Sequence, residues 1–289
     1  MKKSSVKPGH ERGDDAVFSN GTLEFRIPVE FGPRVLFAGF KDRQNLFSTP
    51  DISRKTPFGD WNIFGGHRFW LSPETFPETY YPDNDRVGIR YAGKKLVVSQ
   101  KIRKLGLEKE IELAFTAKNS LSVTHRFRNT GKSRVRFALW ALSVMKKGGF
   151  AIIPQNRGDA DSHGLLPNRN LVLWPYTDVE DRRFFRNDRY YFVRQGGPAP
   201  FKIGQRIDSG WCAYSCGDCL FVKRFVPVKG GDYPDFQSNV EVYSCKDFLE
   251  LETLSPLFDI GPGGSCEYRE IWEFHKGKKI PFGAETIRI

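Results

Sequence analysis

The late stretch DFLELETLSPL holds two carboxylates, Glu250 and Glu252, two residues apart. In an extended strand, successive side chains point to opposite faces, so Leu249, Leu251 and Thr253 would enter a core while both glutamates share the other face. Carboxylates about 7 Å apart along a strand can raise one pKa toward the range of a general base. From alternation alone, the favoured interpretation is a solvent-facing strand with ordinary acids.

A second group of reactive side chains lies in GGHRFWLSPETFPETYYPDND, residues 65–85. The glycine pair allows a sharp turn or a close approach of the backbone to a ligand. His67 can exchange a proton near neutral pH, Arg68 offers a rigid fork of donors, and Trp70 offers an apolar ring face for the C–H face of a sugar. The alternative is a structural crossover loop in which the histidine is merely hydrogen-bonded.

The segment PQNRGDADSHGLLPNRNLVLWPYTD repeats this mixture of polar and aromatic side chains between two apolar runs. Asn168, Arg169 and Trp174 are its candidate sugar contacts, because amide and guanidinium donors suit hydroxyl groups and an indole suits the sugar ring. His163 falls in a polar, turn-rich stretch, where we expect it to have no catalytic role.

Other kinds of chemistry have little support in the sequence. The five histidines are far apart and form no H-x3-H or H-E-x2-H pair, so we expect no metal. The sequence also contains no G-x-S-x-G nucleophile motif, phosphate-binding loop or dinucleotide fingerprint, and we expect no cofactor.

Cys212, Cys216 and Cys219 have the C-x3-C-x2-C spacing of a radical iron–sulfur loop. The residues around them alternate like two strands, however, with Gly217 and Asp218 as a two-residue turn. A cluster loop of that kind is expected beside helices of an α/β barrel, so the pattern favours a hairpin with reduced cysteines.

The net charge is +11, with 45 Lys and Arg against 34 Asp and Glu. The charge is scattered and no nucleic-acid-binding motif accompanies it, so we expect a basic surface or an affinity for anionic sugars rather than nucleic-acid binding. No run of about 18 apolar residues suggests a membrane span. Residues 1–14 are basic without a following apolar run, which predicts a disordered arm, and the expected location is cytoplasmic unless a signal peptide has been removed.

About fourteen short alternating runs, separated by Gly, Pro, Asn and Asp turns, predict a large antiparallel all-β domain over residues 15–289. Turns are expected at 129–132 and 261–264. Helical periodicity and internal repeats are almost absent from the sequence. We therefore predict one domain.

Three separated segments, FGPRVLFAGF followed by NLF, GGHRFWLSPE, and FLELETLSPLFDIGPGGSCEYREIWEF, resemble the galactose mutarotase-like (aldose 1-epimerase-like) superfamily. They resemble more closely an uncharacterised branch of it, a domain of unknown function, with further matches in TYYPDND, WALSVMKKGG and LLPNRNLVLWPYTD. The resemblance covers roughly residues 20–275 and implies a β-supersandwich of two large, mostly antiparallel sheets with a sugar cleft on one concave sheet.

In aldose 1-epimerases of this superfamily, a late-strand glutamate removes the anomeric proton and a histidine protonates the ring oxygen. The resemblance implies Glu252 as the base and places His67 and Arg68 where the family contacts the sugar. The sequence departs from the family at FALWALSVM, where Trp140 occupies the strand that carries the acid histidine. Either His67 or His163 would then serve as the acid, or the chemistry is not mutarotation.

The first hypothesis is a sugar-binding, mutarotase-like protein that epimerises the anomeric carbon with Glu252 as base and His67 as acid. Arg68, Glu74 and Asn168 would hold hydroxyls, Trp70 would stack on the ring, and Arg169, Trp174 and Glu250 would complete the site. A non-catalytic carbohydrate-binding protein and a lyase or hydrolase of an anionic glycan are the alternatives. The identity of the sugar and the oligomeric state stay open.

Overall fold

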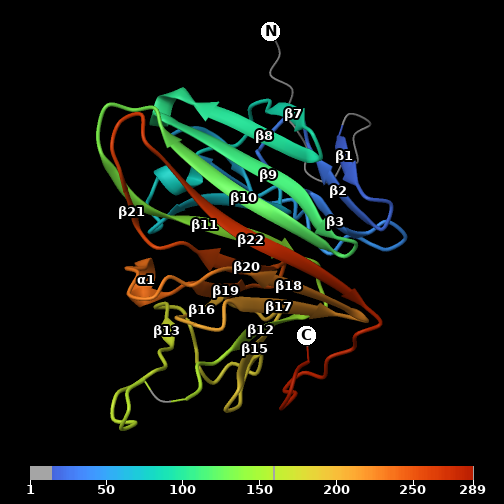
Figure 1. Ribbon diagram of the computed structural model, residues 1–289, viewed down its shortest axis with the longest axis vertical. Helices are drawn as coiled ribbons and strands as arrows, with labels where there is room; N and C mark the ends of the chain where they lie inside the picture. Colours follow the sequence, from blue (N-terminus) through green and yellow to red (C-terminus); the bar gives the residue numbers. More distant parts are fainter. Residues whose placement is uncertain (1–14, 159, 289) are drawn as a thin grey trace.

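The computed structural model describes residues 15–158 and 160–288, and within them almost all regular structure is β (Figure 1). The antiparallel all-β structure confirms the prediction from the alternating runs, and two large sheets pack against each other, as the resemblance implied. No helix among the described residues is long and apolar enough to cross a membrane. The predicted arm at residues 1–14 lies outside the described residues, and the single-domain assignment stays a prediction.

The larger sheet has ten strands in the order β14-β15-β12-β17-β18-β22-β10-β9-β8-β7. Every pairing along it is antiparallel. The strands are β7 (Gly88–Ala92), β8 (Lys95–Ile102), β9 (Leu107–Ala117), β10 (Ser120–Asn129), β12 (Phe150–Pro154), β14 (Phe184–Arg186), β15 (Tyr190–Arg194), β17 (Trp211–Cys216), β18 (Cys219–Arg224) and β22 (Ser265–Lys276).

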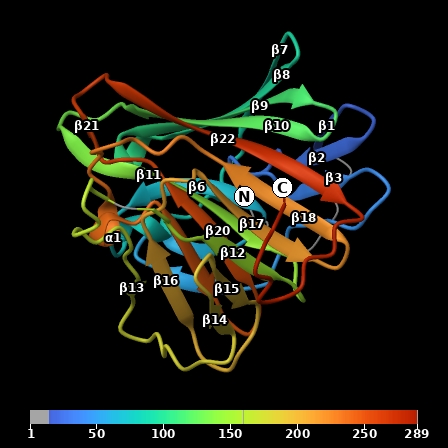
Figure 2. The same cartoon turned by 60° about the horizontal axis from the view of Figure 1, so that its bottom comes forward.

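The smaller sheet carries the candidate site. Its order is β13-β16-β19-β20-β11-β21, and β6 also pairs with β11. Figure 2, in which the bottom of the molecule is turned forward, shows β6, β11, β16 and β20 of this sheet. Its strands are β6 (His67–Ser72), β11 (Val135–Met145), β13 (Val172–Leu173), β16 (Phe201–Gln205), β19 (Val240–Ser244), β20 (Leu249–Leu254) and β21 (Phe258–Ile260).

Smaller elements close the ends of the sandwich. β1 (Ala16–Ser19), β2 (Leu23–Ile27) and β3 (Phe37–Phe40) form a three-stranded sheet, and β4 (Ser53–Thr56) pairs with β5 (Gly59–Asn62) in a separate hairpin. The short helical elements are η1 (Glu78–Tyr80), η2 (Arg103–Leu105) and α1 (Pro234–Gln237).

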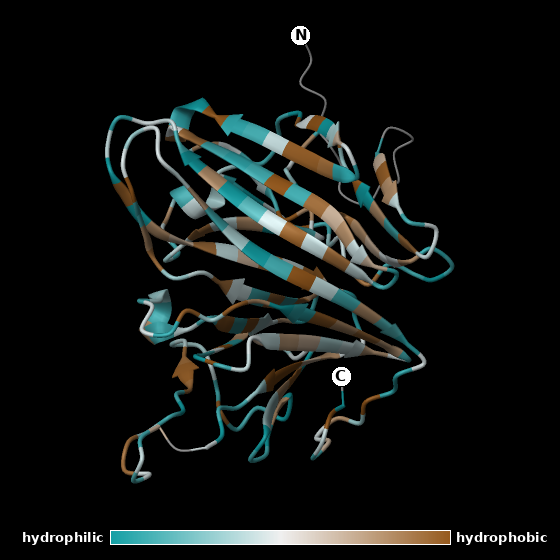
Figure 3. Cartoon of the chain, viewed as in Figure 1, coloured by the Kyte–Doolittle hydropathy of each residue, from teal (hydrophilic) through white to brown (hydrophobic). Residues whose placement is uncertain are grey.

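The core lies between the two large sheets and is rich in aromatic side chains. Trp272 of β22 packs edge-on against Phe221 of β18 and Phe47, with ring centroids 5.6 Å apart in both pairs. Apolar and polar residues alternate along β8, β9, β10 and β22, which is visible as brown and teal bands in Figure 3. This period-two pattern puts one face of each strand in the core and the other toward solvent.

The cysteine hairpin was predicted correctly. β17 and β18 pair with Cys216 directly opposite Cys219, and Gly217 at the turn has a φ of +62°. Cys212 is buried, and burial raises the pKa of its thiol to about 12, which keeps the thiol protonated. The C-x3-C-x2-C spacing here belongs to a β-hairpin, in which Cys212 and Cys216 lie on β17 and Cys219 begins β18.

Candidate functional site

The register of the smaller sheet decides which predicted residues share a face. Leu142 of β11 lies between Arg68 of β6 and Glu252 of β20, so these three side chains point to the same side. The next position of β11, Ser143, is the partner of His67 on β6. His67 therefore points to the opposite face, into the space between the two large sheets.

His67 is completely buried and its ring is fully engaged in hydrogen bonds. His125 Nδ1 must donate to the Tyr268 carbonyl, because a carbonyl only accepts, so the neutral His125 ring accepts at Nε2. His67 Nε2 then donates to His125 Nε2 over 2.7 Å, and the Ser143 hydroxyl donates to His67 Nδ1 over 2.9 Å. Burial, with the neighbouring His125 ring and the positive charge of Lys223, holds the pKa of His67 well below its usual value.

The structure does not bring His67 together with Glu252, because the two side chains lie on opposite faces of one sheet. The alternation of β6 makes this unavoidable once Arg68 points toward the cleft. The glycine pair before His67 serves the fold as well: Gly66 has a φ of +67°, and a Cβ there would overlap the Val35 carbonyl oxygen. The assignment of His67 as a ligand-facing acid is therefore a wrong prediction.

A metal would also fit poorly beside His67. His67, His125 and Glu270 place their ligand atoms within 4.8 Å of one another. Glu270 is already occupied, since Lys223 Nζ lies 2.9 Å from one carboxylate oxygen and Trp272 donates to the other over 2.8 Å. A buried ammonium group opposes a cation, and every ring nitrogen has a hydrogen-bond partner.

The other face of the smaller sheet forms the floor of a cleft of about 640 Å³, which is within the range of small-molecule sites. The β4–β5 hairpin, the segment after β6 and the loop after β13 supply its walls. The lining residues are Ile52, Arg54, Trp61, Ile63, Arg68, Glu74, Thr79, Tyr80, Trp140, Leu142, Trp174, Tyr176, Pro200, Lys202, Tyr243, Cys245, Asp247, Phe248 and Glu250.

Glu250 is a titratable group of the cleft with a pKa close to neutral pH. Its side chain is partly exposed and lines the cleft. Burial, together with the negative charge of Glu252 two residues away, raises the pKa of Glu250 to about 8. Both glutamates share one face, as the period-two pattern of LELET predicted. The favoured interpretation of a solvent-facing strand with ordinary acids is wrong, because Glu252 is completely buried and the pKa of Glu250 is raised.

Glu252 lies directly below the cleft floor and is completely buried. Its Oε2 accepts from Trp140 Nε1 over 2.7 Å and from Lys202 Nζ over 3.0 Å. Lys202 also pairs with Glu241 over 2.7 Å, and its ammonium lies 4.7 Å and 4.6 Å from the ring centroids of Trp140 and Trp174. Burial alone would lower the pKa of Lys202, but the two glutamates raise it well above its usual value, so Lys202 stays charged.

Arg68 is held in place from below by Asp83. The buried Asp83 carboxylate accepts from Arg68 and Arg34 over 3.3 Å each and from Lys109 over 2.7 Å. Burial alone would raise the pKa of Asp83, but these three cations lower it below its usual value. The motif TYYPDND thus fixes the guanidinium that reaches the cleft.

No protein-family model and no curated protein matches the sequence. Solved structures match the whole fold. A galactose mutarotase-like protein from Lactobacillus casei is 12% identical, with a TM-score of 0.56 over 90% of this chain and 100% of that chain. A putative aldose 1-epimerase from Escherichia coli is 12% identical, with a TM-score of 0.55 over 91% and 99%. The chain has the galactose mutarotase-like fold.

A protein from Synechocystis is 13% identical, with a TM-score of 0.59 over 96% of this chain and 100% of that chain. At identities this low, the likeness concerns the fold alone.

On this galactose mutarotase-like fold, several predicted contacts do not reach the cleft. Trp70 is 2% exposed and its ring lies 4.1 Å from the Lys109 ammonium, so it cannot stack on a ligand in the cleft. Asn168 donates to the Gly158 carbonyl, and Arg169 donates to the Asn156 carbonyl and pairs with Asp188. Both side chains are thus used in contacts with other parts of the protein rather than with the cleft.

Arg68, Glu74, Trp174 and Glu250 were predicted as contacts and do line the cleft. Lys202 was missed, as were Tyr243 and the two residues Arg54 and Trp61 of the β4–β5 hairpin. A signal for Lys202 and Tyr243 exists in the sequence, because FKIGQ and VEVYS alternate in the same way as LELET. The hairpin residues carry no such signal, since only the folded chain brings them to the cleft.

Proposed function

We propose that the protein binds a carbohydrate in the cleft of the smaller sheet. The observation that carries the proposal is a cleft on a mutarotase-like fold, with the aromatic side chains of Trp174 and Tyr176 at its edge and charged side chains on its floor. Trp174 is partly exposed and Tyr176 is 45% exposed, while Arg68, Lys202 and Glu250 lie below them. Aromatic faces suit the C–H face of a pyranose, and charged donors and acceptors suit its hydroxyls.

Each charged group of the floor has a defined part in this proposal. Arg68 and Lys202 would donate to sugar hydroxyls, because the guanidinium and the ammonium group are fixed by buried carboxylates. Glu74 and Glu250 would accept from hydroxyls. The lining mixes three bases, Arg54, Arg68 and Lys202, with three acids, Glu74, Asp247 and Glu250, and the pKa of about 8 leaves Glu250 mostly uncharged at neutral pH. No strong charge of one sign faces the ligand, which favours a neutral sugar over a polyanion.

The proposal is tested by titrating the protein with a panel of aldoses, uronic acids and their short oligomers, using isothermal calorimetry. Trp174→Ala should weaken the tightest interaction about tenfold or more, since a lost aromatic contact removes both area and stacking. Trp211→Ala is the matched control, because this partly buried tryptophan lies on β17 of the other large sheet. If no sugar binds, or if both variants bind as the wild type does, the proposal is wrong.

A second candidate function is proton exchange at the anomeric centre, and the pKa of Glu250 favours it. A carboxyl group with a pKa of about 8 is both a competent acid and a competent base near neutral pH. We propose Glu250 for this step rather than Glu252, because Trp140 and Lys202 separate the Glu252 carboxylate from the cleft. The Glu250 carboxylate would remove the proton of the anomeric hydroxyl while the C1–O5 bond breaks and the ring oxygen takes a proton from a water molecule in the open cleft. After rotation about C1–C2, the reverse transfers would close the ring on either face.

Anomeric exchange is measured by exchange NMR on each sugar that binds. Glu250→Gln should lower the exchange rate by about 10²–10⁴, which is the usual worth of one proton-transfer group. Glu252→Gln should change the exchange rate less than Glu250→Gln does. His67→Asn should lower the stability of the fold rather than the exchange rate. Equal exchange in the wild type and Glu250→Gln would exclude the catalytic assignment and leave the binding proposal standing.

A further inference from the structure

A second cavity of about 510 Å³ adjoins the cleft. Four residues line both spaces, namely Arg54, Glu74, Tyr80 and Trp174. The second cavity is large enough for a ligand unit of its own. Because the two cavities share these side chains, one elongated ligand can occupy both.

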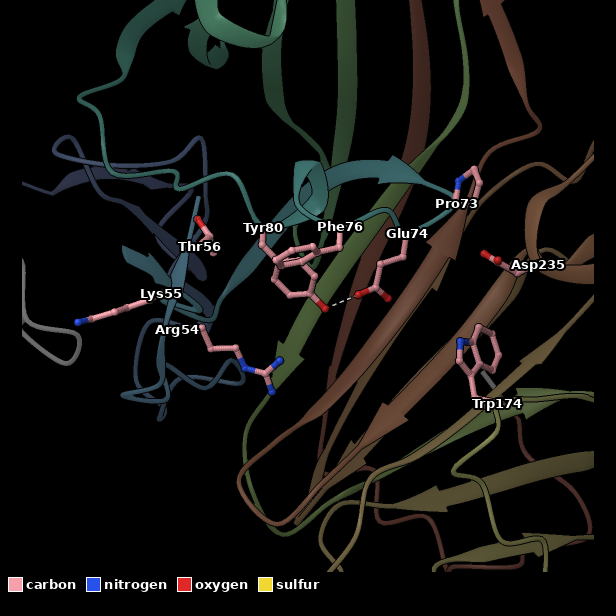
Figure 4. A pocket seen from close by; sticks show the side chains of 9 residues that line it. All are labelled: Arg54, Lys55, Thr56, Pro73, Glu74, Phe76, Tyr80, Trp174 and Asp235. Atoms are coloured by element: carbon pink, nitrogen blue, oxygen red, sulfur yellow. Dashed lines mark hydrogen bonds between the residues drawn. The ribbon is translucent and has the colours of Figure 1, made fainter. Parts of the chain in front are cut away.

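Three separate parts of the chain surround this second cavity. Figure 4 shows Arg54 and Tyr80 on one side, Trp174 and Asp235 on the other, and Glu74 between them. The Tyr80 hydroxyl donates to the Glu74 carboxylate, which fixes both side chains. The cavity therefore repeats the composition of the cleft, with aromatic rings beside carboxylates and a guanidinium.

Large aromatic side chains are left exposed at this place. Phe76 lines the cavity and is 71% exposed, and Phe236, next to the cavity residue Asp235, is 87% exposed. Among the described residues, neither Arg54 nor Lys55 of the hairpin has a side-chain hydrogen bond or an ion pair. Exposed rings beside unpaired donors are typical of a surface that meets a ligand.

The backbone next to the cavity is held in an unusual conformation. Asp235, Phe236 and Gln237 of α1 have φ values of +50°, +54° and +71°, which side-chain-bearing residues rarely adopt. Ser72 donates to Asp235 over 3.0 Å and Gln237 donates to Asp232 over 2.8 Å, so the turn is fixed at both ends. Such strain is found where the surroundings dictate the position of functional side chains.

We propose that the second cavity is a further sugar subsite, so that the ligand is an oligosaccharide of at least two units rather than a free monosaccharide. The proposal rests on sugar binding in the adjoining cleft. One unit lies on the cleft floor over Glu250, and the next lies between Arg54 and Trp174, in contact with Phe76.

The test compares ligand length by calorimetry, with mono-, di-, tri- and tetrasaccharides of the gluco, galacto, manno and xylo series as probes. In the series that binds, the wild type should bind the disaccharide at least tenfold more tightly than the monosaccharide. Phe76→Ala should weaken disaccharide binding about five- to tenfold and leave monosaccharide binding unchanged. Tyr91→Ala is the control, because Tyr91 is a 59% exposed aromatic residue on β7 of the other sheet.

The outcomes separate the two proposals. If monosaccharide and disaccharide bind equally, the subsite is refuted and sugar binding in the cleft stands. If Phe76→Ala binds every length as the wild type does, the subsite is also refuted. If no member of any series binds, both proposals fail. Phe76 is mostly exposed, so its variant should fold, which a thermal melt verifies.

Discussion

Replacing Glu250 by Gln should make the folded protein more stable at alkaline pH. The folded protein holds the Glu250 proton up to a pKa of about 8, whereas the unfolded chain releases it near the ordinary value of 4.5. Below 4.5, both states are protonated. Between 4.5 and 8, only the folded state is protonated, so the free energy of unfolding falls as pH rises. Above 8, Glu250 is charged in both states, and the loss of stability has reached its largest value.

The magnitude follows from the size of the pKa change. Each pKa unit corresponds to about 1.4 kcal/mol, so a rise from 4.5 to about 8 sets an upper limit of about 5 kcal/mol. Glu250 is partly exposed, and solvent screening reduces this to about 2–3 kcal/mol. Gln has nearly the same shape and no charge. Glu250→Gln should therefore match the wild type near pH 5 and exceed it by about 2–3 kcal/mol at pH 8.5.

The assay is urea unfolding, followed by far-UV circular dichroism, at intervals from pH 4.5 to 9. Glu180→Gln serves as the control, because Glu180 is an exposed loop residue and its variant should follow the wild type at every pH. If the free energies of unfolding of the wild type and Glu250→Gln differ by the same amount at pH 5 and pH 8.5, folding does not raise the pKa of Glu250.

Three further predictions concern the groups that build the site, and denaturant melts measure each. Lys202→Met should lower the free energy of unfolding by about 3–5 kcal/mol at neutral pH, because it leaves two buried glutamates without their cation. If Lys202→Met melts as the wild type does, the ion pairs of Lys202 do not stabilise the fold. Asp83→Asn should cost a similar ~3–5 kcal/mol, since three buried cations lose their shared carboxylate; a loss below ~1 kcal/mol contradicts it. Gly66→Ala should destabilise more than Gly93→Ala, because only the Cβ at position 66 would overlap backbone. Equal melts would show that the turn can relax.

The sheet structure could be predicted from the sequence because alternation is a local signal. LELETL and SCEYREIWEFH each show which side chains share a face, and the folded strands follow that pattern. The cysteine hairpin could be placed for the same reason, since the Gly217 turn and the alternation around it agree.

The site was predicted only in part because alternation does not say which face is the cleft. Arg68 and His67 are adjacent in sequence and necessarily point to opposite sides, so at most one of them can reach a ligand on the sheet. Nor does composition separate a ligand contact from a buried support. Trp70 and Trp174 look alike in the sequence, yet Lys109 covers one ring and the other stands at the cavity edge.

Long-range partners account for the remaining differences. The raised pKa of Glu250 depends on burial by the whole cleft as well as on Glu252, which lies on the same strand. The pairing of Glu252 with Lys202 joins residues fifty positions apart. Such contacts follow from the order β16-β19-β20-β11, which no local pattern specifies.

A crystal structure with the tightest-binding sugar from the panel tests the central claim most directly. We expect a sugar ring on the cleft floor, with hydroxyls within hydrogen-bond distance of Arg68 and Glu250 and with Trp174 or Tyr176 against a ring face. A sugar that binds in solution but lies elsewhere in the crystal, with the cleft empty, would contradict carbohydrate binding in this cleft.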